Sequence, residues 1–317
     1  MRRLSIVIPW MGPAGQLEDT LATVLQNRPS GCEILVALAE PYNDPYGVAD
    51  EVTFVPPPAR GDANFVALVN HAVTQAEAPV VHVLACGVRV TEDWTSAALL
   101  HFDDASIAAV APALVSAQNP QRVVAAGIDF TPAGARQLAQ QGRAYNVAEL
   151  VKTRPLAAPL CGGFFRKSVL EALDGFDSSL SLHAAEIDFA LCAAALDLRT
   201  ECEPTSVLEC ATAPTDARMA TGRSLERIYW RHATSEQRRE HAKAHTMRLL
   251  GEFSYAMIQP QWLGHAAGRA MGWLTASFEH CPSARIATAR ERLAAEPQIL
   301  RMPGATSAAP QSQRRAA

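Results

Sequence analysis

The chain has 317 residues, of which 49% are hydrophobic and 19% are charged, with a formal net charge of −4. This length suits one large α/β domain or two smaller ones with a sizeable core. The slightly acidic balance gives no reason to expect nucleic acid as a partner. None of the apolar stretches approaches the length of a membrane span, so the sequence does not predict an integral membrane protein.

The cysteines and the amino terminus indicate a reducing compartment. The seven cysteines are odd in number and include no C-x-x-C pair, which favours buried free thiols over disulfides or a zinc site. Arg2 and Arg3 precede an apolar run that stops at Pro9, which is too short for the core of a secretory signal. We therefore expect a cytoplasmic protein.

The first hundred residues alternate between short β-branched runs and segments with helical spacing. Apolar runs without alternation are typical of parallel strands that are covered on both faces. We expect strands at 4–8, 33–39, 52–55 and 80–84, and helices containing 17–25, 64–77 and the segment that Thr91 would cap. This order, β-α-β-β-α-β-α, predicts a doubly wound α/β fold with a mostly parallel sheet.

The residues that follow the strands are the first place to look for a functional site. In open α/β sheets, ligands bind outside the carboxyl ends of the strands. The segments at that edge are Pro9 to Gly12, Leu38 to Asn43, and Ala85 to Arg89.

The second half of the chain adds further strands and helices. We expect a strand at 106–115, a hairpin excursion over 123–137, and helices at 167–173 and 184–196. From about Ser224 the composition shifts to charged segments with helical spacing, including a helix around 262–278. We therefore divide the chain into a sheet domain at 1–222, a helical extension at 223–303 and a disordered tail at 304–317.

Four stretches together resemble the family 2 glycosyltransferases, which have the GT-A fold. They are "LSIVIPW", "EILVALAEPYND", "APVVHVLACGVRVTEDW" and "LCGGFFRKSVLEALDGFDSSLSLHAAEIDFALCAAALDLR". The last stretch is the most specific, because it combines Arg166, a short helix, the turn Asp174-Gly175-Phe176-Asp177 and the acidic helix start Glu186-Ile187-Asp188. The resemblance covers residues 4–211. It implies that residues 1–222 form a GT-A-like domain for a nucleotide sugar.

The resemblance implies transfer of a sugar from a nucleotide-sugar donor to a glycan or lipid-linked acceptor, with inversion. A carboxylate must then take the acceptor proton. Glu186 aligns best with that role and Asp188 is the second choice. The two side chains point about 200° apart on a helix, so they cannot both face one site. The alternative is that Glu186 only stabilises its helix and Asp188 is merely solvated.

The family's usual metal motif is absent from this chain. The family holds Mg²⁺ or Mn²⁺ with an Asp-x-Asp-like motif, whereas Ala85-Cys86-Gly87 offers no carboxylate. A divalent cation is therefore possible but not certain, and we assign no metal ligand. Basic side chains could take the place of the cation beside the diphosphate, and the candidates are Arg89, Arg60 and His82. The residues that we expect to bind the nucleotide sugar are Pro9, Trp10, Glu40, Asn70, Cys86, Gly87, Arg89, Gly162 and Gly163.

Two other functions are open at this point. The missing carboxylates favour a catalytically inactive GT-A relative that acts as a binding or scaffold protein. Thiol chemistry at Cys86 is a third hypothesis, although the sequence places no activating histidine beside it. The amphipathic helices near the carboxyl terminus also allow peripheral membrane contact.

Overall fold

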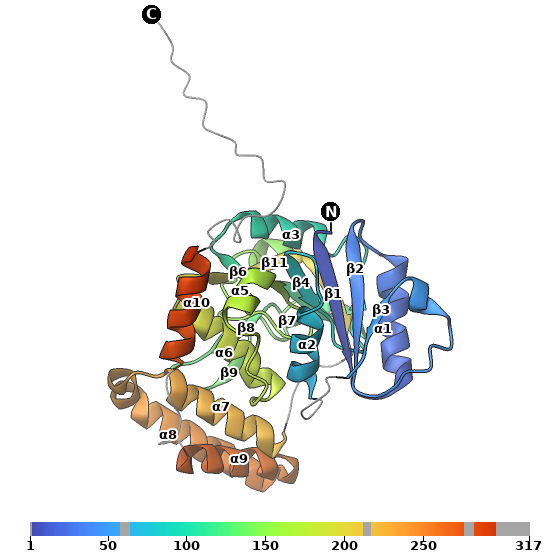
Figure 1. The fold of residues 1–317 in the computed structure, drawn as a ribbon. Helices are drawn as coiled ribbons and strands as arrows, with labels where there is room; N and C mark the ends of the chain where they lie inside the picture. Colours follow the sequence, from blue (N-terminus) through green and yellow to red (C-terminus); the bar gives the residue numbers. More distant parts are fainter. Residues whose placement is uncertain (1, 58–63, 212–216, 276–281, 296–317) are drawn as a thin grey trace, which may run out of the picture.

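The computed structural model describes residues 2–57, 64–211, 217–275 and 282–295 (Figure 1). Its centre is a nine-stranded sheet in the order β3-β2-β1-β4-β10-β6-β11-β5, with β7 paired to β6. The pairs β3-β2, β2-β1, β1-β4 and β6-β11 are parallel, and β10 runs antiparallel between β4 and β6. The predicted α/β class with a mostly parallel sheet is confirmed.

The predicted elements of the first half are present in the predicted order. They are β1 (Leu4–Trp10), α1 (Ala14–Gln26), β2 (Cys32–Leu38), β3 (Thr53–Val55), α2 (Phe65–Val73) and β4 (Val80–Val83). The prediction that Thr91 caps a helix is wrong. Residues Arg89–Val90 form a short strand, β5, which pairs with β11, and helix α3 begins only at Ser96. The Thr91 hydroxyl instead donates a hydrogen bond to the Val207 carbonyl.

The second half contains the expected strand, hairpin and helices, with additional short elements. They are β6 (Ile107–Ser116), β7 (Asn119–Ala125), β8 (Ile128–Phe130), β9 (Arg136–Leu138), α4 (Val147–Leu150), β10 (Phe164–Arg166), α5 (Lys167–Ala172), α6 (Leu182–Ala194) and β11 (Arg199–Cys210). Strands β8 and β9 form a separate two-stranded hairpin.

Both faces of the sheet are covered, which explains the continuous apolar runs. Along β1, the side chains of Ile6 and Ile8 join the core beneath α1 and α3, whereas Val7 joins the core beneath α2, α5 and α6. Successive side chains of a strand point to opposite faces, so a strand buried on both sides is apolar at most positions.

Within the described residues after the sheet, the chain forms four α-helices. They are α7 (Met219–His232), α8 (Ser235–Ile258), α9 (Leu263–Leu274) and α10 (Ser283–Ala295). Helices α7, α8 and α9 pack together at one end of the molecule, and α10 returns to lie on α5 (Figure 1). Helix α7 runs through residue 222, where we predicted a domain boundary.

Among the helices that the structure describes, none combines the length and the apolar character that crossing a bilayer requires. The predicted tail at 304–317, and residues 276–278 of the helix expected around 262–278, lie outside the described residues.

Candidate active site

The end of β4 is held by main-chain hydrogen bonds to its neighbours. Ala85 donates its N–H to the Cys161 carbonyl at 2.9 Å, and Gly87 donates to the Thr20 hydroxyl of α1 at 2.9 Å. The Cys86 thiol donates to the Pro9 carbonyl at 3.4 Å. Burial raises the pKa of Cys86 to about 12, so this thiol stays protonated near neutral pH.

Glu186 lies on the first turns of α6 and is fully enclosed. One carboxylate oxygen accepts a 2.8 Å hydrogen bond from the Leu160 N–H. The other lies 2.7 Å from Arg136 Nη2 and 3.6 Å from His183 Nδ1. The carboxylate therefore has partners from three segments: the loop before β10, the β8–β9 hairpin and its own helix.

These partners keep Glu186 ionised. Burial by itself would raise the pKa of this carboxyl, but Arg136, His183 and the Leu160 N–H outweigh burial, so the pKa of Glu186 lies below its usual value. A carboxylate in this state is an anion across the physiological pH range.

A short hydrogen-bonded path links Glu186 to the end of β4. Leu160 donates its N–H to Glu186, and the carbonyl of the next residue, Cys161, accepts the N–H of Ala85. The fold thus brings together two parts of the predicted site, Ala85 and Glu186, that lie 101 positions apart in the sequence.

Asp188 faces a different set of partners. Its carboxylate lies 2.8 Å from His232 Nε2, 2.8 Å from Arg285 Nη1 and 3.4 Å from Arg231 Nη1. Burial opposes ionisation, but His232, Arg285 and Arg231 outweigh it and hold the pKa of Asp188 below its usual value. Asp188 therefore ties α6 to α7 and α10, and it is buried and ion-paired rather than solvated.

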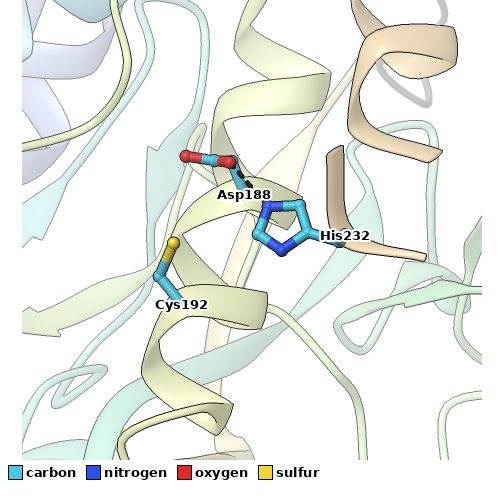
Figure 2. A group of neighbouring side chains, drawn as sticks. All are labelled: Asp188, Cys192 and His232. Atoms are coloured by element: carbon cyan, nitrogen blue, oxygen red, sulfur yellow. Dashed lines mark hydrogen bonds and ion pairs between the residues drawn. The ribbon is translucent and has the colours of Figure 1, made fainter. Parts of the chain in front are cut away.

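Asp188, Cys192 and His232 form a cluster whose donor atoms all lie within 4.8 Å of one another (Figure 2). These are donor types that zinc accepts. However, two guanidinium groups already contact the Asp188 carboxylate, and a divalent cation there would meet their charge at close range. We therefore assign no metal to this cluster.

The predicted donor-binding residues Trp10, Glu40 and Arg89 come from β1, the loop after β2 and β5. Trp10 is buried, its ring packs edge-on against Tyr42 at 5.4 Å, and its carbonyl accepts the Ala39 N–H. Glu40 is exposed in the following loop. Arg89 is half-exposed on β5 and lies 3.5 Å from Asp19 of α1.

Of the other two basic residues proposed to replace the cation, His82 is in the core and Arg60 is outside the described residues. His82 is buried, stacks on Phe164 and accepts a hydrogen bond from Trp94 Nε1. Burial lowers the pKa of His82 to about 3, so this ring is neutral and belongs to the core. Arg60 lies outside the described residues.

Asn70, Gly162 and Gly163 shape the chain around the site. The Asn70 side chain binds both the N–H and the carbonyl of Phe176 and so holds the Asp174–Asp177 turn. A Cβ at Gly162 would lie 2.8 Å from Leu208 Cδ1, and one at Gly163 would lie 2.9 Å from the Pro159 carbonyl. Only glycine fits at these two positions without a shift of the neighbours.

A cavity of about 500 Å³ adjoins the partners of Glu186. Its walls include Arg136 and His183, together with Leu225 of α7, Arg248 of α8 and Trp262 of the turn between α8 and α9. Sequence reasoning missed all five. Arg136 occurs in a stretch without a recognisable motif, and His183 lies within the most specific stretch of the resemblance but is not one of the residues that carry it. Only the folded chain brings Arg136 to Glu186.

Comparison with known proteins gives the fold. No protein-family model matches the chain, and no curated protein matches its sequence. Among solved structures, the chain is similar to the mannosyltransferase PcManGT from Pyrobaculum calidifontis in complex with GDP-Man and Mn²⁺, with 16% identity and a TM-score of 0.51 over 94% of this chain and 76% of that one.

The chain is also similar to GalNAc-T7 with UDP, GalNAc and Mn²⁺, with 11% identity and a TM-score of 0.57 over 94% of this chain and 57% of that one. It therefore spans just over half the length of this second structure. At such low identities the likeness shows the fold and not the activity. The expected fold is confirmed: the chain has a GT-A-like glycosyltransferase fold.

Proposed function

We propose that this protein is a glycosyltransferase that moves a sugar from a nucleotide-sugar donor to a glycan or lipid-linked acceptor, with inversion at the anomeric carbon. The hydrogen-bonded path from Glu186 through Leu160 and Cys161 to Ala85 carries this proposal, because it links an ionised carboxylate to the sheet edge where such folds bind ligands. The two similar structures, which hold GDP-Man or UDP, support a nucleotide-sugar donor.

In the proposed reaction, the acceptor hydroxyl oxygen bonds to the anomeric carbon while the bond from that carbon to the diphosphate oxygen breaks. The electron pair of the broken bond leaves with the nucleoside diphosphate, and the acceptor proton passes to Glu186. Arg136 is paired with Glu186 and holds that carboxylate in place. We assign Arg89, at the margin of the donor site, to offset the diphosphate charge as the reaction proceeds. Asp188 has a structural role, because its ion pairs link α6 to α7 and α10.

The donor site that we propose works without a divalent cation. Ala85, Cys86 and Gly87 carry no carboxylate, and the protonated Cys86 thiol donates its hydrogen to Pro9. A hard cation prefers oxygen ligands, so these residues do not fit Mn²⁺ or Mg²⁺. We propose that the donor lies against Pro9, Trp10, Cys86 and Gly87, with Glu40 and Arg89 at the margins of its site.

Thermal unfolding with a panel of UDP- and GDP-sugars tests donor binding. A donor that binds only the native state, at a concentration of about 100 times its Kd, raises the free energy of unfolding by about 2.7 kcal/mol. We expect one nucleotide class to raise Tm by the same amount with Mn²⁺ and with EDTA. If none of these donors raises Tm, the proposal fails.

The substitution Glu186→Gln tests the base. We expect turnover to fall about 100-fold or more while the donor-induced Tm shift stays, because proton transfer is lost and donor contacts are not. Glu171→Gln is the matched control, since Glu171 is more than half exposed on α5 and pairs only with Lys167 among the contacts that the structure describes. Unchanged turnover in Glu186→Gln would show that Glu186 is not the base. Absence of turnover in the unchanged protein, with a donor that binds, would favour the inactive relative.

The inactive binding or scaffold relative remains the second candidate function. The observation that favours it is that the Glu186 carboxylate is fully buried and already holds Arg136 and the Leu160 N–H. In that case Glu186 acts only to hold the hairpin against α6, and the protein binds sugars or partners without turnover.

A lipid-linked acceptor would bring the protein to a membrane surface, and α8 and α9 offer a face for such contact. Exposed apolar side chains on these helices include Met247, Leu250, Met257, Ile258, Leu263, Trp273 and Leu274. Arg239 and Lys243 are exposed on the amino-terminal half of α8 and suit anionic headgroups. Co-sedimentation with vesicles of phosphatidylcholine and phosphatidylglycerol tests this, and Leu250→Glu with Ile258→Glu is expected to abolish it.

A further inference from the structure

Two cavities at the carboxyl-terminal helices adjoin one another, and we treat them as one groove. The cavity beside Arg136 and His183 has a volume of about 500 Å³, and a neighbouring cavity has a volume of about 410 Å³. Both are lined by the same four residues: Arg248, Glu252, Trp262 and His265. The groove therefore extends from the partners of Glu186, past these shared residues, toward Tyr255 on α8.

The middle of the groove carries an aromatic ring that is partly exposed. Trp262 ends the short turn Pro260–Trp262 between α8 and α9, and its ring packs edge-on near Tyr255 at 6.1 Å and His265 at 5.5 Å. These neighbours hold the ring in place while part of it faces the cavity. A fixed indole ring offers a flat apolar surface with little loss of side-chain entropy on binding.

The charges around the groove are compensated within the protein. Arg136 pairs with Glu186, Arg248 pairs with Glu252, and the buried Arg269 pairs with both Glu226 and Glu252. Because each guanidinium already has a carboxylate, a charged ligand would find no excess of opposite charge among these groups. A neutral ligand with several hydroxyls would find both hydrogen-bond donors and acceptors.

One donor in the groove is free to bind such a ligand. Nη1 of Arg248 is buried and has no hydrogen-bond partner within the part of the chain that the structure describes. A buried donor without a partner is costly. The Arg248 side chain lines both cavities and is 19% exposed, so a small rotation of its guanidinium would bring Nη1 to a ligand hydroxyl. His183, at the inner end, lies 3.6 Å from Glu186 and is more than nine-tenths buried.

We infer that this groove binds a neutral sugar ring of the acceptor, stacked on Trp262, hydrogen-bonded to Arg248 and directed toward His183 and Glu186. The assignment of this sugar as the acceptor rests on the proposed function. The mixture of an aromatic wall and a few convergent polar groups is typical of sites for small ligands.

The test is saturation-transfer NMR and tryptophan fluorescence titration of the full chain. The probes are the methyl glycosides of glucose, galactose, mannose and N-acetylglucosamine, their β-linked disaccharides, and glucuronic acid as an anionic comparison. We expect a neutral saccharide to bind at millimolar concentration. Trp262→Ala is expected to weaken it about tenfold, whereas Trp262→Phe retains most of the affinity.

Trp273→Ala is the matched control, because Trp273 lies on α9 and is 55% exposed. We expect this variant to bind saccharides like the unchanged protein. The inference is overturned if no neutral saccharide binds, if glucuronic acid binds more tightly, or if folded Trp262→Ala, checked by circular dichroism, binds normally. Donor-induced stabilisation, measured on the same samples, separates failure of the groove from failure of the proposed transferase.

Discussion

The Glu186 carboxylate and the Arg136 guanidinium form an ion pair of 2.7 Å between side chains that are 0% and 10% exposed. Arg136 belongs to the β8–β9 hairpin and Glu186 to α6, so the pair joins two elements that are separate in the chain. The carbonyls of Ala133 and Gly134, in the turn of the same hairpin, contact His245 of α8 and Arg269 of α9. The carboxyl-terminal helices thereby hold the hairpin that positions Arg136.

Replacing Arg136 should leave a buried charge without its main partner. We expect Arg136→Met to lower the free energy of unfolding by about 3 kcal/mol at pH 7, since removing one member of a buried pair strands the other. The pKa of Glu186 is depressed in the folded protein. Its stabilisation is therefore present above the unfolded carboxyl pKa of about 4.3 and is lost as pH falls through the folded value.

Urea unfolding of the unchanged protein and of Arg136→Met, at pH 7 and at a series of values below pH 4, measures this difference. We expect the gap between the two proteins to narrow as the pH falls. A gap that is the same at every pH would show that Arg136 contributes packing and not charge compensation.

Arg285 should decide whether α10 stays docked. Its guanidinium contacts the Asp188 carboxylate at 2.8 Å and the carbonyls of Leu173 and Gly175 at 2.7 and 2.5 Å. We expect Arg285→Ala to increase hydrogen exchange throughout residues 283–295, because three contacts to α6 and to the end of α5 are lost together. Mass spectrometry of the exchanged peptides measures it.

Arg290→Ala is the control for that experiment, because its described contact is a single exposed hydrogen bond to the Ala195 carbonyl. It should leave exchange in α10 nearly unchanged. Equal effects of the two substitutions would contradict a specific role for Arg285.

The close packing of α7 and α9 depends on glycine. A Cβ at Gly268 would lie 2.0 Å from the Met219 carbonyl, whereas a Cβ at Gly251 on α8 meets nothing within 4 Å. We expect Gly268→Ala to destabilise the protein by about 1–3 kcal/mol, since the helices must separate. Gly251→Ala should stabilise it by up to about 1 kcal/mol through helix propensity. Thermal and urea unfolding compare the two, and similar effects of both would refute this packing.

Cys86 should be unreactive. With a pKa of about 12, its thiolate fraction at pH 7.5 is below about 1 in 10,000, compared with about a tenth for an unperturbed thiol. We expect iodoacetamide to modify Cys86 at least about 100-fold more slowly in the native protein than in urea. Peptide mapping by mass spectrometry checks the rate. Fast modification of the native protein would reopen thiol chemistry at the end of β4.

The strands and their order were predictable because a strand covered on both faces is apolar at most of its positions. Leu4 to Ile8, Glu33 to Ala39 and Val80 to Leu84 each satisfy that rule locally. Strand β5 was missed because two residues, Arg89 and Val90, carry no pattern of their own. They become a strand only by pairing with β11, more than a hundred residues later in the chain.

The residue types at the end of β4, including its lack of carboxylates, can be read directly from the chain, as can the opposed directions of Glu186 and Asp188 on one helix. Which groups meet those carboxylates cannot be read in this way. Long-range packing determines the positions of Arg136, His183, Arg285 and Trp262. A local sequence pattern does not predict contacts between segments that are distant in the chain. Hydrophobic periodicity therefore specified the layers, while the partners that set the charge of Glu186 and the walls of the groove arose only when the layers were assembled.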